Sequence, residues 1–360
     1  MNRETIAVAM SGGVDSSVAA ALLKEQGHDV VGITLQLWPK AAADLDRHHG
    51  CCSLDAVEDA RRVANHLGIP YYVLDVQEEF QARVVEPFLT DYEQGRTPNP
   101  CISCNNEVKF DLLLRKARSI GAAALATGHY ARVDAHDGEM RLLRAVDPGK
   151  DQSYVLYGVT QDELALARFP LGEWRKEDVR RRARELGLVT ADKPDSVEIC
   201  FVTGGDYRQL LAQRPDTSGE IRHLDGWLLG RHPGVWNYTV GQRSGLGALP
   251  RGVAGPLYVV DIDAVTRTVT MGPREALLQD RLEVGEMSFV AGAPPATEFD
   301  ADVRVRYGTS PVASRVKLAG PGTAEVHPSE PLTSASPGQA AVMYEGDVVL
   351  GGGRIQRRVA

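Results

Sequence analysis

The sequence predicts an α/β domain built on a parallel sheet, followed by a small mostly-β middle domain and a C-terminal β-barrel. Two observations carry this prediction. Short β-rich runs alternate with helical patterns over the first two hundred residues, which indicates a sheet with crossover helices. After about Tyr207, turn signals crowd together and short alternating runs replace the helices, which is typical of β structure.

The parallel sheet is expected to contain strands at Thr5 to Ala9, Asp29 to Leu35, Tyr71 to Leu74 and Ala123 to Thr127. Between the second and third of these, apolar residues recur at steps of three and four from Leu54 to Leu67. This spacing predicts a helix with one apolar face, which Gly68 and Pro70 end.

The second half is expected to form two β domains. Its turn signals are Asp225-Gly226, Pro233-Gly234 and Gly245 to Gly247, and Tyr258 to Ile262 alternates as a strand does. Loops are expected at Ala291 to Pro295 and Pro328 to Gly338, whereas Ala340 to Gln356 has the alternation of barrel strands. We therefore expect domains at residues 1–206, 207–280 and 281–360.

Composition argues against several classes of protein. No run of about eighteen apolar residues occurs, and the N-terminus leads straight into a strand, so we expect no membrane association and a cytoplasmic location. Five cysteines in such a chain are expected to be thiols with chemical or packing roles, not a disulfide framework. A net charge of -8 disfavours bulk attraction of nucleic acid, so an RNA partner would need a local basic face.

The clearest functional motif is the run Ser11-Gly12-Gly13-Val14-Asp15-Ser16-Ser17, which links the first strand to an Ala- and Leu-rich helix. Glycines permit close backbone approach to an anion, the helix N-terminus favours negative charge, and the serine hydroxyls can donate to phosphate oxygens. The run lacks the Gly-Lys-Ser/Thr ending of a Walker A loop. An isolated Gly-Gly would more often be a tight turn. Here a strand precedes the glycines, and hydroxyls, a carboxylate and a helix follow in the expected order, which favours a phosphate site.

Cysteines form a second motif. Cys101 and Cys104 lie three residues apart after a turn, and Asp111 to Arg118 reads as a helix, so their thiols are expected to have lowered pKa values. Cys200 lies in Ser196 to Phe201, which reads as a strand, where a lone cysteine is most often a small buried apolar side chain. Cys51 and Cys52 follow His48-His49, and incidental thiols in a loop are favoured there over a metal site.

The loop resembles that of the PP-loop pyrophosphatases, and the chain as a whole is similar to the tRNA-specific 2-thiouridylase family. The resemblance rests on several motifs in one order: Ser11 to Ser16, Gly95 to Pro100, Cys104-Asn105, Lys109-Phe110, Thr127 to Tyr130, Lys150 to Tyr154, Ile199 to Phe201, Gly241 to Arg243 and Gly351 to Gly353.

The resemblance implies a mechanism. ATP would adenylate O2 of uridine 34 in the tRNA anticodon, with Mg2+ on the loop and Asp15 as its nearest candidate ligand. Adenylation turns a poor leaving group into a good one. Cys200 would carry the incoming sulfur as a persulfide and Cys104 would be the nucleophilic cysteine, and a Cys104-Cys200 disulfide would remain. Glutamate, glutamine and lysine tRNAs and a sulfur-donor protein are the implied partners.

The same resemblance implies two sets of binding residues. The nucleotide contacts are Ala9, Met10, Ser11, Gly12, Gly13, Val14, Asp15, Ser16, Leu35 and Gly128. The target-base contacts are Asn99, Pro100 and Cys101, and the tRNA contacts are His129, Lys150, Asp151, Gln152, Arg306, Tyr307 and Gln339.

Ordinary structural roles compete with several of these assignments. His129 could be a satisfied histidine at a strand end, and Lys150 to Gln152 a solvated turn. The arginines from Arg180 to Arg184 are typical of a solvated helix face. For the basic tail from Arg354 to Arg358, a role without RNA contact is slightly favoured over a contact with RNA.

Cys101 departs from the family, because many members carry Asp at this position. With Cys104 and Cys200 it could hold a [4Fe-4S] cluster with one open iron, or with His129 added a zinc ion, or it could be a bystander. Two other functions remain: a PP-loop small-molecule ligase of the amidotransferase or argininosuccinate synthetase type, and an RNA-binding protein with a retired ATP site. The paired thiols and the intact loop argue against them.

Overall fold

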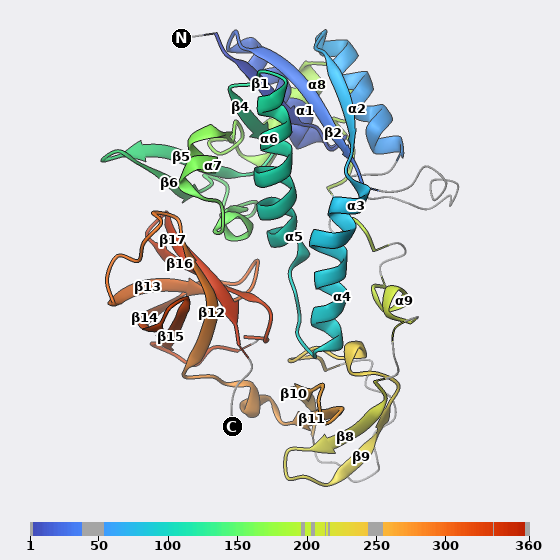
Figure 1. Cartoon of the computed structure of the whole chain (residues 1–360), viewed down its shortest axis with the longest axis vertical. Coiled ribbons are helices and arrows are strands. Elements are labelled where there is room, and N and C mark those ends of the chain that lie inside the picture. The colour runs from blue at the N-terminus through green and yellow to red at the C-terminus, as the bar shows by residue number, and fades with distance from the viewer. Residues whose placement is uncertain are drawn as a thin grey trace.

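The computed structural model describes residues 3–37, 54–195, 199–202, 206–212, 214, 217–243, 255–333 and 335–356. The chain forms an α/β domain, a closed barrel beside its long helices and a small β domain at the opposite end of the long axis (Figure 1). The predicted fold class is confirmed. Among the described residues, no helix is long and apolar enough to cross a membrane.

The first sheet is entirely parallel and has the order β3-β2-β1-β4-β7. The four predicted strands are confirmed to within one residue, whereas the two-residue β7 was too short to be predicted. The bounds are β1 Thr5–Ala9, β2 Asp29–Gln36, β3 Tyr71–Asp75, β4 Ala124–Thr127 and β7 Ala167–Arg168.

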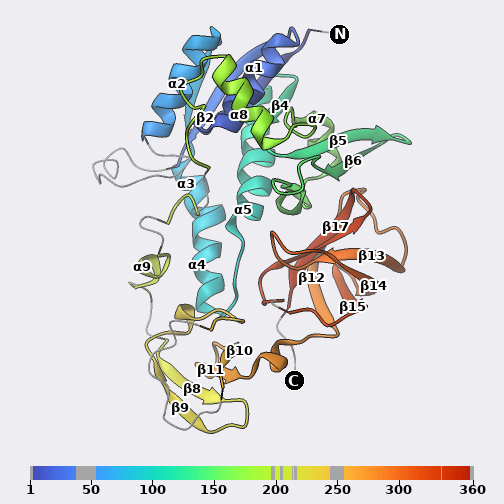
Figure 2. The ribbon, with the colours of Figure 1, turned by 180° about the vertical axis from the view of Figure 1, so that it is seen from behind.

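Helices cover both faces of this sheet, as a parallel sheet requires. On one face lie α1 (Val14–Glu25), the predicted α2 (Leu54–Leu67) and α8 (Lys176–Glu185), visible together in Figure 2. They bury Ile6 and Val8 of β1, while Ala7 packs on the other face against the helix that follows the cysteines. Alternate residues of β1 therefore serve two separate cores.

Two long helical segments extend from the sheet toward the small β domain (Figure 1). The first comprises α3 Gln77–Phe80, a π-helix Gln81–Val85 and α4 Glu86–Glu93. The second comprises α5 Pro100–Ser103, a π-helix Cys104–Leu113 and α6 Leu114–Ser119. The helix predicted at Asp111 to Arg118 thus begins eleven residues earlier, at Pro100, and it includes both cysteines.

The small β domain has the sheet order β10-β11-β8-β9, with one parallel pair between β11 and β8. The predicted turn at Asp225-Gly226 is confirmed, since Gly226 has φ +90°, and residues 245–247 lie outside the described residues. The elements are α9 Arg208–Leu211, β8 Gly219–His223, β9 Leu228–His232, the 3-10 helix Val235–Asn237, β10 Tyr258–Asp263, β11 Thr268–Gly272 and the 3-10 helix Arg274–Leu277.

The C-terminal strands close into a six-stranded antiparallel barrel, because β12 pairs with both β15 and β17. Its core holds Val303, Val316 and Met343. The loop predicted at Ala291 to Pro295 is confirmed, whereas the one predicted at Pro328 to Gly338 starts after Pro328, the last residue of β15, and its residue 334 lies outside the described residues. The strands are β12 Leu282–Phe289, β13 Glu298–Arg304, β14 Val312–Gly320, β15 Thr323–Pro328, β16 Ala340–Glu345 and β17 Val348–Ile355.

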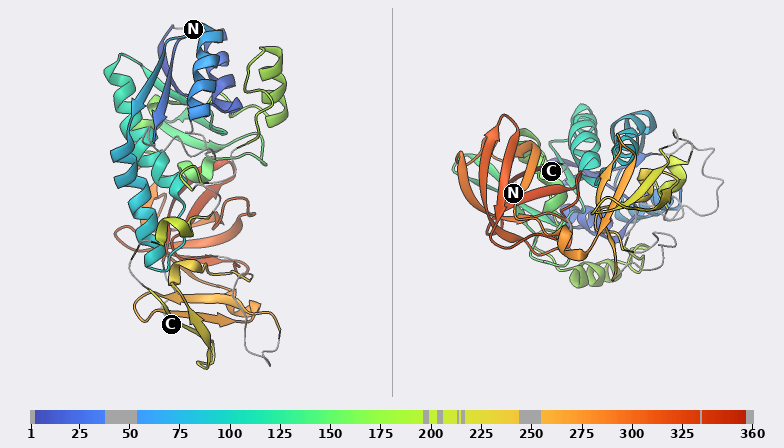
Figure 3. Two further views of the ribbon diagram at one scale, coloured as in Figure 1. Left: turned by 90° about the vertical axis from the view of Figure 1, so that its right-hand side faces the viewer. Right: turned by 90° about the horizontal axis from the view of Figure 1, so that it is seen from below.

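A hairpin from the first domain joins the barrel, which the sequence did not reveal. Strands β5 (Ala131–His136) and β6 (Glu139–Arg144) follow β4, and Leu143 of β6 pairs with Val348 of β17. Figure 3 shows the barrel beside the α/β domain from two further sides. The segment after this hairpin, with the 3-10 helix Ser153–Leu156 and α7 Gln161–Leu166, therefore lies where the two domains meet.

Candidate active site

The loop between β1 and α1 has the shape expected of a phosphate cradle. Gly12 has φ +67°, and a Cβ there would lie 2.1 Å from the Ala56 carbonyl oxygen of α2. Gly128, at the end of β4, approaches the first turn of α1 so closely that a Cβ would lie 2.7 Å from the Ser16 nitrogen. Both glycines are therefore required by close backbone approach at the N-terminus of a twelve-residue helix.

The serine hydroxyls mostly shape the loop itself. Ser17 is fully buried and donates its hydroxyl to the Gly13 carbonyl at 2.8 Å, so in this structure the hydroxyl stabilises the loop. Ser16 donates to the same carbonyl at 3.2 Å and accepts from the Ser11 nitrogen at 3.1 Å. Ser11 is only partly buried and remains the best placed of the three hydroxyls to reach a ligand.

Replacing Gly128 by Ala should weaken the nucleotide site. The new methyl group would meet the Ser16 nitrogen and, at 2.9 Å, the Asp15 carbonyl carbon, so the start of α1 must shift. We expect the KM for ATP to rise by about tenfold, as for other small displacements of a binding loop. Initial rates of ATP turnover at increasing ATP concentration measure this. Gly230→Ala, at a glycine with open space around its Cβ position, should leave KM unchanged.

Asp15 is held by two side chains from distant parts of the chain. Lys176 of α8 places its ammonium 2.7 Å from both carboxylate oxygens, and Tyr130 donates its hydroxyl to one of them at 2.8 Å. Burial, and then the neighbouring Asp15 carboxylate, raise the pKa of Tyr130, so this hydroxyl stays a donor. Lys176 itself is buried and lies 2.9 Å from Asp195.

Two lysines thus supply the positive charge that the loop motif lacks. Lys193 donates its ammonium to the Gly12 carbonyl at 3.0 Å and pairs with Asp59 of α2 at 2.8 Å. Neither Lys176 nor Lys193 was predicted, because they follow the loop by more than 160 residues and belong to no local motif. The only sequence signal was their place in and just after a basic helix.

Asp195 gathers three cations. Lys150 lies 2.8 Å, Lys176 2.9 Å and Arg180 2.6 Å from its carboxylate. Burial alone would raise the pKa of Asp195, but hydrogen bonds from Lys150 and Lys176, with their charges, lower it to about 2. The carboxylate consequently links Lys150, a predicted tRNA contact, to the Lys176–Asp15 pair at the loop.

Asp195→Asn should change the pH dependence of the free energy of unfolding. A carboxylate with a lowered folded-state pKa stabilises the fold above its ordinary pKa of 3.8, and this contribution is lost as the pH falls from about 4 to about 2. The variant should therefore lose about 1 kcal/mol of unfolding free energy at neutral pH, a value that allows for partial solvent screening. The difference from the parent should shrink below pH 4 in denaturant titrations. A constant difference down to pH 2 would contradict the assignment.

The remaining predicted nucleotide residues line the C-terminal ends of β1 and β2. Thr34 donates its hydroxyl to the Met10 carbonyl at 2.6 Å, and the Met10 nitrogen donates to Ile33 at 2.8 Å. Ala9 and Leu35 are partly buried against the same core. This apolar edge beside the loop suits the face of an adenine ring, whereas Val14 is buried in the separate core that contains residues of α1 and α2.

The cysteine helix begins where the sequence motif places it. Asn99 accepts a hydrogen bond from the Cys101 nitrogen at 3.2 Å, and Pro100 occupies the first helical position. Cys101 is exposed, whereas Cys104, one turn on, is partly buried. Both thiols therefore lie in the first turns, where the helix dipole favours a thiolate.

Cys200 and Cys104 pack against one apolar cluster. Phe201 anchors the Cys200 segment, since it is buried and meets Phe80 and Phe88 edge-on at 5.8 and 5.0 Å between ring centroids. The strand predicted at Ser196 to Phe201 is wrong for the described part, because residues 199–201 form a turn. Packing of Phe201, and not pairing in a sheet, therefore holds Cys200 against the same apolar cluster as Cys104.

The described thiols form neither a disulfide nor a metal cage. Cys101, Cys104 and Cys200 are unlinked to one another. Among the described residues, no three His, Cys, Asp or Glu side chains are grouped so as to hold a metal ion. The donor set therefore does not fit the [4Fe-4S] cluster or the zinc site considered from the sequence. Cys51 and Cys52 lie outside the described residues.

His129 is an internal acceptor. It is buried, and its Nδ1 lies 2.7 Å from the Thr127 hydroxyl while its Nε2 lies 3.4 Å from the Lys109 ammonium. Burial and then the Lys109 charge hold the pKa of His129 well below its usual range. The ring is thus neutral, with Nε2 accepting from Lys109. This geometry favours the satisfied histidine over a direct tRNA contact.

Of the three residues predicted as tRNA contacts at 150–152, the first is at the surface and the other two make contacts inside the protein. Lys150 is partly exposed. Asp151 is buried and accepts from the Ala145 and Ser153 nitrogens at 3.1 and 3.2 Å, so its side chain is turned away from any RNA. Gln152 accepts from the Tyr130 nitrogen at 3.0 Å. The assignment of Asp151 as a tRNA contact is therefore not supported by its burial.

The segment after β13 brings Tyr307 close to the 3-10 helix Ser153–Leu156. Its ring lies 6.3 Å from that of Tyr154 and is 47% exposed. Burial raises the pKa of Tyr307, the charges of Asp151 and Cys101 raise it further, and the charges of Lys150 and Arg304 oppose the rise, so these groups lie near its side chain. Arg306 beside it is exposed. Residues from the segment 150–154, the cysteine helix and the barrel thus lie near one another.

Two predictions about basic segments need correction or restriction. Arg180 does not lie on a solvated face, because it donates to the Ala191 and Lys193 carbonyls and pairs with Asp195. Arg354 pairs with Asp91 of α4 rather than facing outward. Residues 357 and 358 lie outside the described residues.

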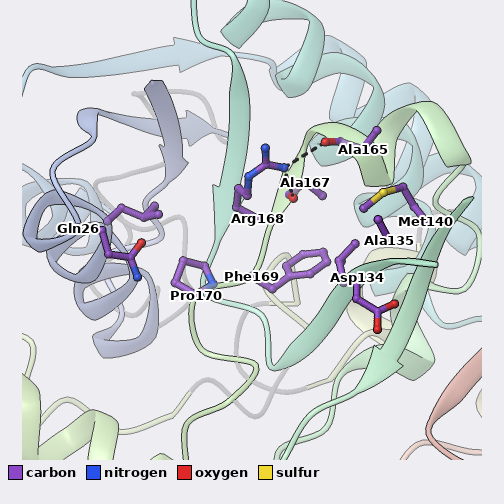
Figure 4. A pocket seen from close by; sticks show the side chains of 11 residues that line it. Gln26, Asp134, Ala135, Met140, Ala165, Ala167, Arg168, Phe169 and Pro170 are labelled. Atoms are coloured by element: carbon purple, nitrogen blue, oxygen red, sulfur yellow. Dashed lines mark hydrogen bonds between the residues drawn. The ribbon is translucent and has the colours of Figure 1, made fainter. Parts of the chain in front are cut away.

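A pocket of about 450 Å3 lies between the C-terminal end of α1, the β5–β6 hairpin and β7 (Figure 4). Arg168 lines it but donates to the Ala165 and Ala167 carbonyls at 3.0 and 2.9 Å. No predicted site residue is among its lining residues, so the pocket is separate from the candidate active site.

Comparison with known proteins agrees with this geometry. Family models match three successive parts of the chain: a tRNA methyl transferase HUP domain at residues 4–204, a tRNA methyl transferase PRC-barrel domain at 208–273 and an aminomethyltransferase β-barrel domain at 279–355. The tRNA-specific 2-thiouridylase MnmA of Geobacter metallireducens is 50% identical and covers 98% of this chain and 97% of its own. The chain belongs to the tRNA-specific 2-thiouridylase family.

Other members of this family are similarly close. The enzyme named MnmA in Geotalea uraniireducens is 48% identical over 99% of this chain and 96% of its own, and that of Carboxydothermus hydrogenoformans is 47% identical over 100% and 99%. A solved 4-thiouridine synthetase–RNA complex with bound ATP matches 55% of this chain and 45% of that chain, at 18% identity and a TM-score of 0.36. A similarity of that size carries no argument.

Proposed function

We propose that this chain is an ATP-dependent tRNA 2-thiouridylase that replaces O2 of uridine 34 by sulfur. The observation that carries the proposal is the presence in one chain of a phosphate loop at the N-terminus of α1 and of two partly buried thiols that pack against a single apolar cluster. Near-full-length identity to proteins named tRNA-specific 2-thiouridylase supports it.

The first stage is adenylation. The uridine O2 attacks the α-phosphorus of ATP, pyrophosphate leaves, and the oxygen becomes part of an AMP leaving group. The contribution of this chain is electrostatic: the N-terminus of α1 and the ammonium groups of Lys176 and Lys193 gather positive charge where pyrophosphate charge develops. Ala9 and Leu35 offer an apolar edge for the adenine.

The second stage transfers sulfur. The terminal sulfur of a Cys200 persulfide attacks C2 and AMP leaves with the former O2. The Cys104 thiolate then attacks the Cys200 sulfur, which releases 2-thiouridine and leaves a Cys104–Cys200 disulfide. The persulfide sulfur is thereby reduced by two electrons and the two thiols are oxidised, so a dithiol reductant must restore the enzyme.

The implied metal and cluster fit less well than ATP. Both oxygens of Asp15 are held by Lys176, so a Mg2+ ion at Asp15 would have to displace that ammonium. The described cysteines do not form a cluster cage. The persulfide route, which needs no iron–sulfur cluster, is therefore preferred to the iron–sulfur route.

The substrate class is RNA bound between the cysteine helix and the barrel. Lys150, Arg306 and Tyr307 are the exposed or partly exposed candidates for contact with the anticodon region. Glutamate, glutamine and lysine tRNAs, a sulfur-donor protein and a cytoplasmic location belong to this proposal. So do the boundaries of the catalytic, central and barrel domains at 1–206, 207–280 and 281–360.

Two alternatives are weaker. A PP-loop small-molecule ligase would use the loop but has no use for thiols at two separate positions against one cluster. An RNA-binding protein with a retired ATP site would not need the close glycine approaches at Gly12 and Gly128. No specific observation favours either.

The products of ATP test the proposal. With tRNA and a persulfide source present, the chain should release AMP and pyrophosphate in equal amounts, because the charge at the loop serves the pyrophosphate group. Chromatography of labelled ATP separates AMP from ADP. ADP as the main product would reject adenylation and leave only the fold assignment standing.

A further inference from the structure

The barrel is hydrogen-bonded to the loop that leads into the cysteine helix. Between β15 and β16, the Pro337 carbonyl accepts a hydrogen bond from the Thr97 nitrogen at 2.7 Å. Gln339 returns a hydrogen bond from its side-chain amide to the Thr97 carbonyl, also at 2.7 Å. Gly338 between them has φ +90°, and a Cβ there would lie 2.9 Å from the Thr97 nitrogen. The two backbones are therefore in direct contact.

An ion pair reinforces the same junction. Arg354 of β17 pairs with the buried Asp91 of α4. Asp91 also accepts from the Arg96 guanidinium at 2.9 Å, and its own carbonyl accepts from the Arg96 nitrogen at 2.9 Å. The loop from Gly95 to Thr97 is thus fixed by the barrel through charge-assisted bonds as well as through Thr97.

The fixed loop is directly connected to the thiols. Pro98 and Pro100 restrict the backbone on either side of Asn99, which caps the helix by accepting from the Cys101 nitrogen. Only three residues separate Thr97 from Cys101. A displacement of Thr97 would therefore be transmitted to Cys101 and, one turn further, to Cys104.

We propose that Gln339 and Arg354 are positioning residues for sulfur transfer: the barrel fixes the start of the cysteine helix, and Gln339 does so by donating to the Thr97 carbonyl. This inference rests on the proposed function. The residues act through Thr97 and Asp91, not by touching the substrate, and neither contact involves a residue of the phosphate loop.

A loosened cysteine helix should separate the two stages of the reaction. Adenylated uridine can react with the persulfide, which gives 2-thiouridine and AMP, or with water, which restores uridine and releases AMP. Adenylation depends on the loop before α1 and should persist. Sulfur transfer depends on the placement of Cys104 and should fall, because small misplacements of a reacting group are costly.

The test compares Gln339→Ala and Arg354→Met with the parent, and uses Gln356→Ala as the control. Gln356 is an exposed barrel glutamine whose amide donates to a carbonyl within the barrel. AMP release, 2-thiouridine formation and the tRNA Kd are measured for each. At saturating tRNA, we expect 2-thiouridine per AMP to fall about tenfold in both variants, with AMP release within about twofold of the parent.

Three results would overturn the inference. A raised tRNA Kd in Gln339→Ala, with an unchanged ratio of 2-thiouridine to AMP at saturating tRNA, would make Gln339 an RNA contact. A parallel loss of AMP and 2-thiouridine with a lowered Tm would make the contact merely structural. A parent that forms no AMP would reject the proposed function as well, which separates that failure from the other two.

Discussion

Replacing Cys104 or Cys200 by Ser should abolish sulfur transfer while leaving adenylation. Both thiols pack against one cluster, and the proposed mechanism gives each a covalent role that a hydroxyl cannot fill. We expect 2-thiouridine formation to fall by at least about a thousandfold in either variant, as for other nucleophile replacements. Liquid chromatography of digested tRNA measures the product, and AMP release in the first turnover should stay within a few-fold of the parent.

Cys101→Ser is the matched control on the same helix. Cys101 is exposed and, among the described residues, shares no metal cage with the other two thiols. Its variant should keep most of its activity after purification and assay without oxygen or added iron. If Cys101→Ser were as inactive as Cys104→Ser and had lost bound iron relative to the parent, the persulfide route would be wrong and the three-thiolate cluster right.

Lys176→Met should nearly eliminate ATP cleavage. The Lys176 ammonium satisfies both oxygens of Asp15 and also touches Asp195, so its loss leaves two carboxylates repelling each other and the incoming phosphates at the start of α1. We expect AMP release to fall by at least about a hundredfold. The free energy of unfolding should drop by about 1–3 kcal/mol, since both carboxylates remain partly solvated.

Arg181→Met provides the control for Lys176→Met. Arg181 lies on the same helix, but its guanidinium is exposed and pairs with Asp178 one turn away. Such a surface pair contributes little, so AMP release and stability should both stay close to those of the parent. Steady-state kinetics and denaturant titrations of both variants check the prediction. Full ATP cleavage by Lys176→Met would show that the charge near the loop has no role in turnover.

The first sheet could be predicted from the sequence because local pattern and tertiary structure agree there. The runs at Thr5 to Ala9 and Tyr71 to Leu74 are short, apolar and bounded by turn or helix signals, and both are strands in the structure. The same agreement holds for Gly12, whose positive φ the loop motif implied. The local sequence was sufficient to predict the structure where the interacting residues are close together in the chain.

Long-range partners could not be predicted in this way. Lys176 reaches Asp15, and Arg354 reaches Asp91, across more than 150 residues of sequence, and no periodicity encodes such pairs. The Cys200 segment was misread as a strand because Val, Ile and Phe favour strands, whereas packing of Phe201 between Phe80 and Phe88 decides its conformation. Resemblance to the family supplied Gln339, but the structure gives its amide to Thr97.

The most direct test of the central claim is to identify the product on the tRNA. The purified chain is incubated with unmodified glutamate tRNA, ATP and a persulfide source, and the digested nucleosides are analysed by mass spectrometry. The account predicts a uridine at the wobble position that has gained the mass of sulfur in place of oxygen, dependent on ATP, on Cys104 and on Cys200. A methylated uridine, or sulfur incorporation that persists without ATP, would contradict it.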